Sequence, residues 1–291
     1  MARVLPLLLA SLLLGARPDS SARSTGAPVG LRLAVLPCSN IETTFKKFHP
    51  LLSYLKAETG IPVTILVPGD LAEFESVTKN GNFDFALQDP HTFDQLSRYF
   101  VKSSLLQTRA LDDTTEQSGV VIVRRESGLG SLADLRGKTV MFGPRTSTPK
   151  WVAARLLFEA QGLSVDRDLR AVNGGCCEDI AFAVFVRSAD AGVICDHFLT
   201  KHTARQKELG VTPESLQVVG RTPAFPTRMF AARLGVPADT IRAVAEALLR
   251  LDPKVARHSA ILSSAEVRGF FRTTEAAYLA AVARSTRGDR R

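Results

Sequence analysis

The chain has 291 residues, of which 45% are hydrophobic, so it is long enough to bury the core of one large domain or of two lobes. Its net charge is +8, or +7 without residues 1–22, and its lysines and arginines are scattered along the chain. A basic surface suits an anionic ligand. No basic stripe interleaved with aromatic residues and no nucleic-acid motif is present, so we expect no nucleic-acid partner.

Residues 1–22 have the pattern of a secretory signal peptide. Arg3 supplies the positive charge, leucine dominates residues 5–14, and small residues surround Ala22, near which we expect cleavage. The apolar run is far shorter than the roughly 20 residues that cross a bilayer. No later stretch is long and apolar enough to do so, and we therefore expect a soluble, exported protein.

The rest of the chain alternates short strands with helices. Strands are predicted at residues 31–36, 63–67, 83–87, 119–124, 139–142, 191–194 and 218–219. Helices are predicted before Thr59 with a kink or break at Pro50, after an N-cap at Asp70, and at 132–135, 149–161, 180–185, 238–251, 253–262 and 274–283. This alternation predicts an α/β layer architecture with largely parallel sheets.

The segment 139–161 joins a strand to a helix through a Gly-Pro pair and a hydroxyl cluster. Three consecutive hydroxyl residues precede a helix start at Pro149: Thr146, Ser147 and Thr148. A helix start carries unpaired N–H groups and a partial positive charge, so it favours an anion. Arg145 and Lys150 would add full charges beside it. The alternative interpretation is ordinary helix capping without a ligand.

Five segments together resemble the phosphate-, phosphonate- and phosphite-binding proteins of bacterial ABC transporters. They are LRLAVLP, FKKFHPLLSYLKAETGIPV, NGNFDFALQDPHTF, GVVIVRRESGLGSLADLRGKTVMFGPRTSTP and EDIAFAVFVRSADAGVICD. The resemblance implies a type II periplasmic-binding-protein fold, an α/β fold of two lobes with a mainly parallel sheet in each and a two-strand hinge. We expect lobe one at 28–117 and 223–291, the latter with the C-terminal helices, and lobe two at 118–222.

The resemblance also implies where the ligand binds. In the family a Ser-Thr-Ser-Gly helix start holds the phosphorus oxyanion, and the three hydroxyl positions match Thr146, Ser147 and Thr148 here. Pro149 and Lys150 stand where glycine is usual. Pro149 removes one N–H donor, and the charge of Lys150 can replace it.

Further ligand contacts are predicted on the same basis. Cys177 lies where the family commonly has a histidine, and Glu178 and Asp196 lie near positions that can hold the amine of an aminophosphonate. The alternative is that both acids only cap helices. His91, in a cleft-facing loop, and Ser39, after the first strand, complete the candidates.

The four cysteines leave several possibilities open: Cys38, Cys176, Cys177 and Cys195. Export permits disulfides, and four cysteines allow three full pairings. We expect one structural bridge, between Cys195 and either Cys176 or Cys177, because both sites would face the cleft. No CxxC pair or suitably spaced histidine supports zinc, so no metal and no cofactor is expected.

We make two further predictions for the turn at residues 173–178. Gly174 and Gly175 allow positive φ angles and a close approach of the backbone to a ligand. The sulfur of Cys177 is predicted to be neutral, as a disulfide or a protonated thiol, because a thiolate would repel an oxyanion. A nucleophilic cysteine would need a positioned histidine base, which His197 offers only by proximity in sequence, so we expect no enzyme.

Together these features predict a monomeric periplasmic solute-binding protein that captures a small oxyanion, such as phosphate, phosphite or a phosphonate. It would deliver this ligand to an ABC permease in the inner membrane. One alternative is a ligand-sensing module of the same fold that reports to a membrane receptor. Another is a thiol redox or metal-handling protein that uses Cys176 and Cys177.

Overall fold

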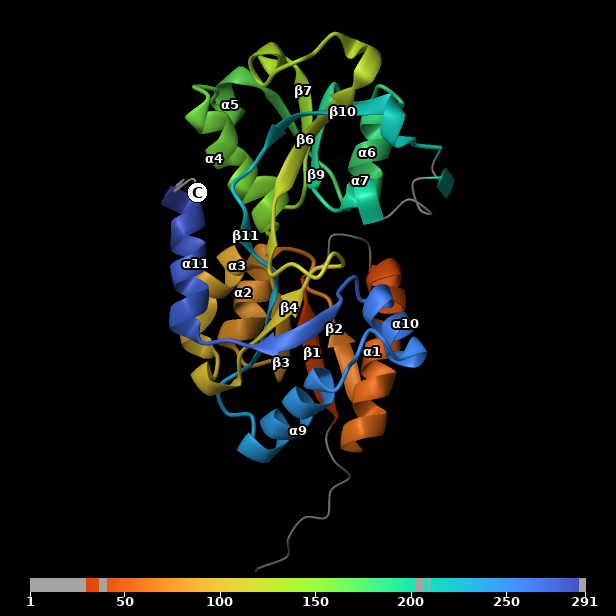
Figure 1. Ribbon diagram of the computed structural model, residues 1–291. Coiled ribbons are helices and arrows are strands. Elements are labelled where there is room, and N and C mark those ends of the chain that lie inside the picture. Colours follow the sequence, from red (N-terminus) through yellow and green to blue (C-terminus); the bar gives the residue numbers. More distant parts are fainter. Residues whose placement is uncertain (1–29, 37–40, 202–206, 209, 288–291) are drawn as a thin grey trace, which may run out of the picture.

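The computed structural model describes residues 30–36, 41–201, 207–208 and 210–287, which form two lobes, one above the other in Figure 1. The lower lobe contains a six-stranded sheet in the order β13-β4-β12-β3-β1-β2. Its strands are β1 (Leu31–Val35), β2 (Val63–Leu66), β3 (Phe85–Gln88), β4 (Leu106–Arg109), β12 (Met229–Ala232) and β13 (Gly269–Arg272). Strand β1 pairs in parallel with β2 and β3, whereas β12 and β13 add antiparallel pairs.

Helices cover both faces of this sheet. They are α1 (Ile41–Thr59), α2 (Leu71–Lys79), α3 (Pro90–Leu96), α9 (Ala238–Leu249), α10 (Ala256–Ser264) and α11 (Glu275–Arg287). Neighbouring residues of β1 point to opposite faces, as the two-residue period of a strand requires. Leu33 packs with α1, α9 and α10, and Ala34 packs with α2, α3 and α11.

The upper lobe contains a five-stranded sheet in the order β10-β6-β9-β7-β8. Its strands are β6 (Gly119–Arg124), β7 (Thr139–Phe142), β8 (Arg170–Asn173), β9 (Ala191–Cys195) and β10 (Leu216–Arg221). Its helices are α4 (Ala153–Ala160), α5 (Val165–Asp168), α6 (Cys177–Phe185) and α7 (Phe198–Lys201). Strand β7 is parallel to β8 and β9, while β6 is antiparallel to β9 and β10. Both sheets are therefore mixed sheets with parallel core strands.

The predicted two-lobed α/β fold is confirmed, with differences in detail. Helix α1 continues through Pro50 without a break, because Phe48, Leu51 and Leu55 bury side chains on both sides of the proline. The predicted N-cap of α2 is present: the side chain of Asp70 accepts the backbone N–H of Glu73 at 2.8 Å. Strands β4, β8, β12 and β13 were not predicted.

Two chain segments cross between the lobes side by side. Strands β5 (Glu116–Gln117) and β11 (Phe225–Pro226) pair antiparallel in a small sheet of their own. Just beyond β11, the hydroxyl group of Tyr278 donates to the carbonyl of Thr227 at 2.7 Å, which ties the crossing to α11. Among the described residues, no helix is long and apolar enough to cross a membrane.

Candidate functional site

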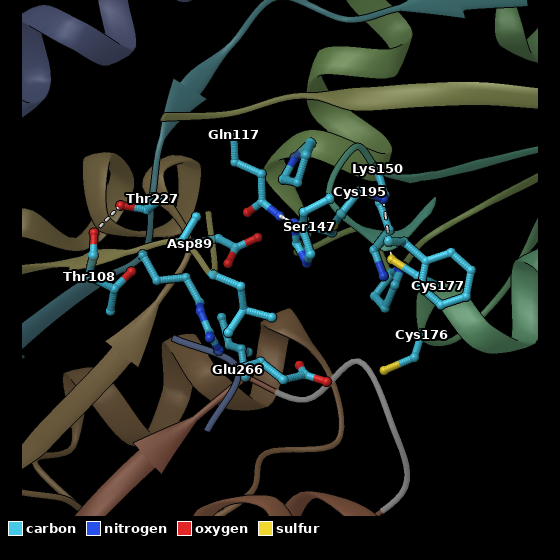
Figure 2. Close-up of a pocket in the computed structure, with 18 of the residues that line it drawn as sticks. Asp89, Thr108, Gln117, Ser147, Lys150, Cys176, Cys177, Cys195, Thr227 and Glu266 are labelled. Carbon is cyan, nitrogen blue, oxygen red and sulfur yellow. Dashed lines mark hydrogen bonds between the residues drawn. The ribbon is translucent and has the colours of Figure 1, made fainter. Parts of the chain in front are cut away.

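A cavity of about 120 Å³ lies between the lobes, near the carboxyl ends of β3, β7 and β9. Crevices at the carboxyl ends of parallel strands are the usual ligand sites of open α/β sheets. Figure 2 shows that both lobes contribute side chains. From the upper lobe come Thr146, Ser147, Lys150, Cys177, Glu178 and Cys195, and from the lower lobe Asp89, Thr108, Arg109, Thr227, Arg228 and Glu266.

The hydroxyl cluster enters a wide helical turn instead of the predicted ordinary helix start at Pro149. Residues Thr148–Val152 form a π-helical turn, and α4 follows from Ala153. The carbonyl of Ser147 accepts two N–H groups, from Trp151 at 3.0 Å and from Val152 at 3.3 Å. Pro149 is compatible with this first turn, because the N–H that proline lacks would have no partner inside the helix there. Residues 146–150, called the hydroxyl turn below, are all buried.

Lys150 places a buried ammonium group at the wall of the cavity. Its Nζ donates to the carbonyl of Gly175 at 3.1 Å. Its side chain lies against Gly143, where an added Cβ would be only 2.6 Å from the Lys150 Cβ, so only glycine fits there. Burial alone would lower the pKa of Lys150, but the nearby acidic groups, chiefly the thiols of Cys177 and Cys195, outweigh it and raise this pKa. The group therefore stays charged at neutral pH.

Asp89 joins the lower lobe to the hydroxyl turn. It stands at the start of α3, but its side chain does not cap that helix. Instead, its Oδ2 accepts the backbone N–H of Thr148 at 3.0 Å, and the Thr148 hydroxyl accepts the N–H of His91 at 3.1 Å. Burial raises the pKa of Asp89, against the opposing effects of the Thr148 N–H and of the Arg228 and Lys150 charges.

The cysteine-rich turn differs from the prediction. Cys177 and Cys195 are free, so the expected bridge to Cys195 is wrong. Cys176 is disulfide-bonded, and Cys38 lies outside the described residues. The backbone N–H of Cys195 donates to the Cys177 Sγ at 3.2 Å, and a hydrogen bond from the Cys195 thiol lowers the pKa of Cys177. The protonation state of Cys177 stays a prediction.

Gly174 is needed in this turn because there is no room for a side chain, and not because its backbone is left-handed. Neither Gly174 nor Gly175 has the positive φ that glycine allows. A Cβ on Gly174 would lie 2.7 Å from a carbon of Ile180 and 2.8 Å from one of Met141, so glycine is needed for close packing. The backbone N–H of Cys176, the N-cap residue of α6, donates to the side chain of Asp179 at 3.0 Å.

The structure brings five of the nine predicted ligand residues to the cavity wall: Thr146, Ser147, Lys150, Cys177 and Glu178. Thr148 is fully buried and is not part of the lining. The ring of His91 contacts the side chain of Gln95 at 3.1 Å and is not part of the lining. Ser39 lies outside the described residues. The ligand contacts themselves stay predictions.

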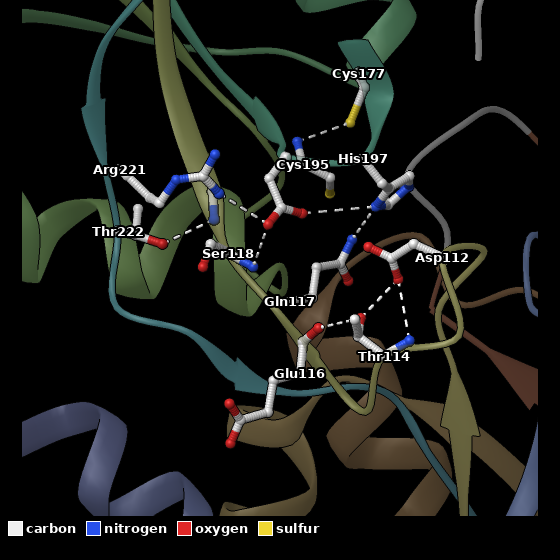
Figure 3. A network of polar contacts seen from close by, with 12 residues as sticks. Asp112, Thr114, Glu116, Gln117, Ser118, Cys177, Cys195, His197, Arg221 and Thr222 are labelled. Atoms are coloured by element: carbon white, nitrogen blue, oxygen red, sulfur yellow. Dashed lines mark hydrogen bonds and ion pairs between the residues drawn. The ribbon is translucent and has the colours of Figure 1, made fainter. Parts of the chain in front are cut away.

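Asp196 belongs to the crossing between the lobes and not to the cavity wall. Its carboxylate accepts hydrogen bonds from the guanidinium of Arg221 at 3.0 Å and from the backbone N–H of Ser118 at 3.4 Å, and Figure 3 shows Arg221 and Ser118 side by side in this network. In the same network the amide of Gln117 contacts His197 Nδ1 at 2.8 Å. Arg145 is not part of the cavity lining either: its guanidinium lies over the Trp151 ring, 4.7 Å from the ring centroid.

Several lining residues were missed by the sequence reasoning: Asp89, Thr108, Arg109, Gln117, Thr227, Arg228 and Glu266. Most come from the crossing segments or from strand β4, which was not predicted. Asp89 had a visible signal, an Asp-Pro pair directly after a predicted strand, but that pattern reads as a helix N-cap. Glu266 is held by an ion pair with Lys47 at 2.7 Å.

The two lobes, the paired crossing segments and the cavity between them define a two-lobed periplasmic binding protein. Residues 33–278 match the family model described as "ABC transporter, phosphonate, periplasmic substrate-binding protein". The chain therefore belongs to this family of non-enzymatic substrate-binding proteins, which serve ABC-type phosphonate import.

Solved structures share the fold. A binding-protein component of an ABC phosphonate transporter from Pseudomonas aeruginosa is 16% identical with a TM-score of 0.75, over 87% of this chain and 84% of that one. PhnD1 from Prochlorococcus marinus, solved with methylphosphonate, is 17% identical with a TM-score of 0.71, over 85% and 94%. A Xanthomonas citri protein bound to chloride is 20% identical with a TM-score of 0.70, over 89% and 96%.

Proposed function

We propose that the protein captures a small phosphonate-type oxyanion whose oxygens contact the hydroxyl turn. The observation that supports this most strongly is the set of two hydroxyl groups, Thr146 and Ser147, beside the buried ammonium of Lys150 on one cavity wall. Hydroxyls donate hydrogen bonds to anionic oxygens, and a charged donor about doubles the strength of such a bond. Ser147 takes the central contact, between Thr146 and Lys150.

Asp89 adds a requirement for one proton. Its carboxyl group faces the same cavity, and two negative charges in a buried site repel each other strongly. One proton therefore lies between Asp89 and the oxyanion, either on the carboxyl group or on a phosphorus-bound oxygen. A phosphonate that carries a P–OH group supplies this proton, whereas sulfate at neutral pH does not. We expect the site to prefer phosphorus oxyanions to sulfate.

The rest of the cavity holds the substituent on phosphorus. The volume of about 120 Å³ favours a small group. Glu178 faces this space and is the described residue best placed to accept an ammonium group from an aminophosphonate, while Asp196 is engaged with Arg221. Methylphosphonate and aminoethylphosphonate are therefore the first ligands to compare.

Closure of the two lobes would allow the protein to deliver the bound ligand to a permease. Closure about β5 and β11 encloses the ligand, and the closed monomer presents both lobes to an ABC permease in the inner membrane. Residues 1–22 would be removed on export to the periplasm. N-terminal sequencing of protein recovered from the periplasm checks the cleavage, and a start upstream of residue 15 would contradict it.

The test is a thermal-shift panel with phosphate, phosphite, methylphosphonate, aminoethylphosphonate, sulfate and acetate. A ligand present at 100 times its dissociation constant stabilises the fold by about 2.7 kcal/mol. We expect at least one phosphorus oxyanion to raise the unfolding temperature at micromolar concentration, with sulfate and acetate inactive. Stabilisation by the carboxylate alone, or by none of the phosphorus compounds, would contradict the proposal.

A further inference from the structure

Two free thiols meet on the cavity wall, and the oxyanion proposal gives them no role. Cys177 is the first residue of α6 and Cys195 the last residue of β9, so rigid elements hold both. The backbone N–H of Cys195 donates to the Cys177 Sγ at 3.2 Å, which brings the two cysteines together, and the Cys195 thiol lowers the pKa of Cys177. Both line the cavity (Figure 2) and are partly exposed to it.

The surroundings of this pair restrict what it can bind. Among the described residues, no group of three or more histidine, cysteine or acidic side chains could hold a metal ion. The buried ammonium of Lys150 lies close enough to both sulfurs to influence their ionisation, and it repels a cation. A suitable ligand is therefore uncharged, bonds strongly to sulfur and needs only two sulfur donors.

We propose that Cys177 and Cys195 form a chelating dithiol that binds trivalent arsenic, presented as uncharged arsenous acid. Soft thiolate ligands select soft, sulfur-seeking centres. Arsenic(III) needs three bonds, of which the two sulfurs supply two and a retained hydroxyl the third. That hydroxyl faces a cavity whose polar wall includes Ser147 and Glu178.

The binding step balances without any oxidant or reductant. Arsenous acid, As(OH)₃, reacts with two thiols to give the bis-thiolate As(OH)(S-Cys)₂ and two molecules of water. Two As–S bonds form and two As–O bonds break, each hydroxyl leaves with one thiol proton, and arsenic stays trivalent.

The different pKa shifts of the two thiols set the order in which the two As–S bonds form. A lowered pKa makes Cys177 the first nucleophile, since the thiolate is the reactive form. The pKa of Cys195 is raised well above its ordinary value, because Cys195 donates its hydrogen to Cys177 and because the surrounding protein removes most of the water that would solvate its thiolate. Cys195 therefore keeps its proton until the second hydroxyl of arsenic leaves.

This site shares its cavity with the hydroxyl turn but does not depend on phosphonate binding. It rests on two free cysteines that line the same wall and are joined by the bond from the Cys195 N–H to the Cys177 sulfur, whatever ligand Ser147 contacts. Arsenic held there would occupy space needed by an oxyanion, so the two ligands would compete.

The experiment uses the exported protein, purified without reductant so that the Cys176 disulfide is kept. Free thiols are first mapped in denaturant, and Cys177 and Cys195 are expected to be among them. Native mass spectrometry with sodium arsenite should then show one arsenic per chain. Cys177→Ser and Cys195→Ser should each weaken uptake about 100-fold, because the second As–S bond gains from the high effective concentration of its partner.

Peptide mapping after alkylation gives a readout that needs no variant. Arsenite should protect both Cys177 and Cys195 from iodoacetamide in the wild-type protein, and a competing small dithiol should restore labelling. Thermal melts of the serine variants check that they fold. The proposal is overturned if the isolated protein has no free thiols, which would mean a Cys177–Cys195 disulfide, if the wild type takes up no arsenic, or if either folded serine variant keeps wild-type affinity.

Discussion

Replacing Lys150 with methionine removes the buried positive charge while keeping an unbranched side chain against Gly143. A hydrogen bond to a charged group contributes about 1.5–3 kcal/mol. We therefore expect Lys150→Met to raise the dissociation constant for a phosphonate about 10- to 150-fold. The pKa of Lys150 is raised, because its acidic neighbours outweigh burial. Its charge is therefore present below the unfolded-state pKa and is lost only in alkali, so the loss of affinity should be constant across neutral pH.

Calorimetric titration measures this effect, with Lys46→Met as the matched control. Lys46 is an exposed lysine of α1 that pairs only locally, with Glu42 at 2.6 Å. The control should bind like the wild type. Lys150→Met should also unfold at a lower temperature, because Asp89 loses a nearby compensating charge. Wild-type affinity in a folded Lys150→Met protein would refute the role of this ammonium in the site.

Three further changes test other parts of the site. Burial raises the pKa of Asp89. Both the oxyanion affinity and the contribution of this group to stability should therefore be greatest in acid and should fall as the pH rises through the folded-state pKa. In titrations across that pH range, Asp89→Asn should make the affinity less dependent on pH. Gly119→Ala places a Cβ 2.3 Å from the Pro149 carbonyl oxygen and should cost about 1–3 kcal/mol in denaturant unfolding, whereas Gly269→Ala, with no atom within 4 Å, should cost less. Ligand binding should reduce the radius of gyration in small-angle scattering, and an unchanged radius with a verified ligand would contradict hinge closure.

The sequence predicted the parts of the fold that have strong local signals. Alternating apolar runs located β1, β6 and β7, and Asp70 marked the start of α2 because its side chain caps the helix locally. Strands β4, β12 and β13 were missed because their identity depends on antiparallel pairing between distant parts of the chain. Pairing of that kind leaves no pattern within one short segment.

In the site, too, the sequence predicted residues that are neighbours in the chain and missed contacts between distant residues. The hydroxyl turn was predicted because its residues are consecutive, and Lys150 followed from its position in the turn. Asp89 was missed because its partner, the N–H of Thr148, is 59 positions away on the other lobe. The expected disulfide at Cys195 was wrong because sequence shows neither which sulfurs approach each other nor that the Cys195 N–H would donate to Cys177.

The most direct test of the central claim is a calorimetric titration of methylphosphonate into the wild type and Ser147→Ala in parallel. The wild type should bind one molecule per chain. Loss of the Ser147 hydroxyl should weaken binding by about 1.5–3 kcal/mol, the contribution of a hydrogen bond to a charged group. Equal affinities in the two proteins, or no binding of any phosphorus oxyanion by the wild type, would contradict the assignment of the hydroxyl turn as the ligand site.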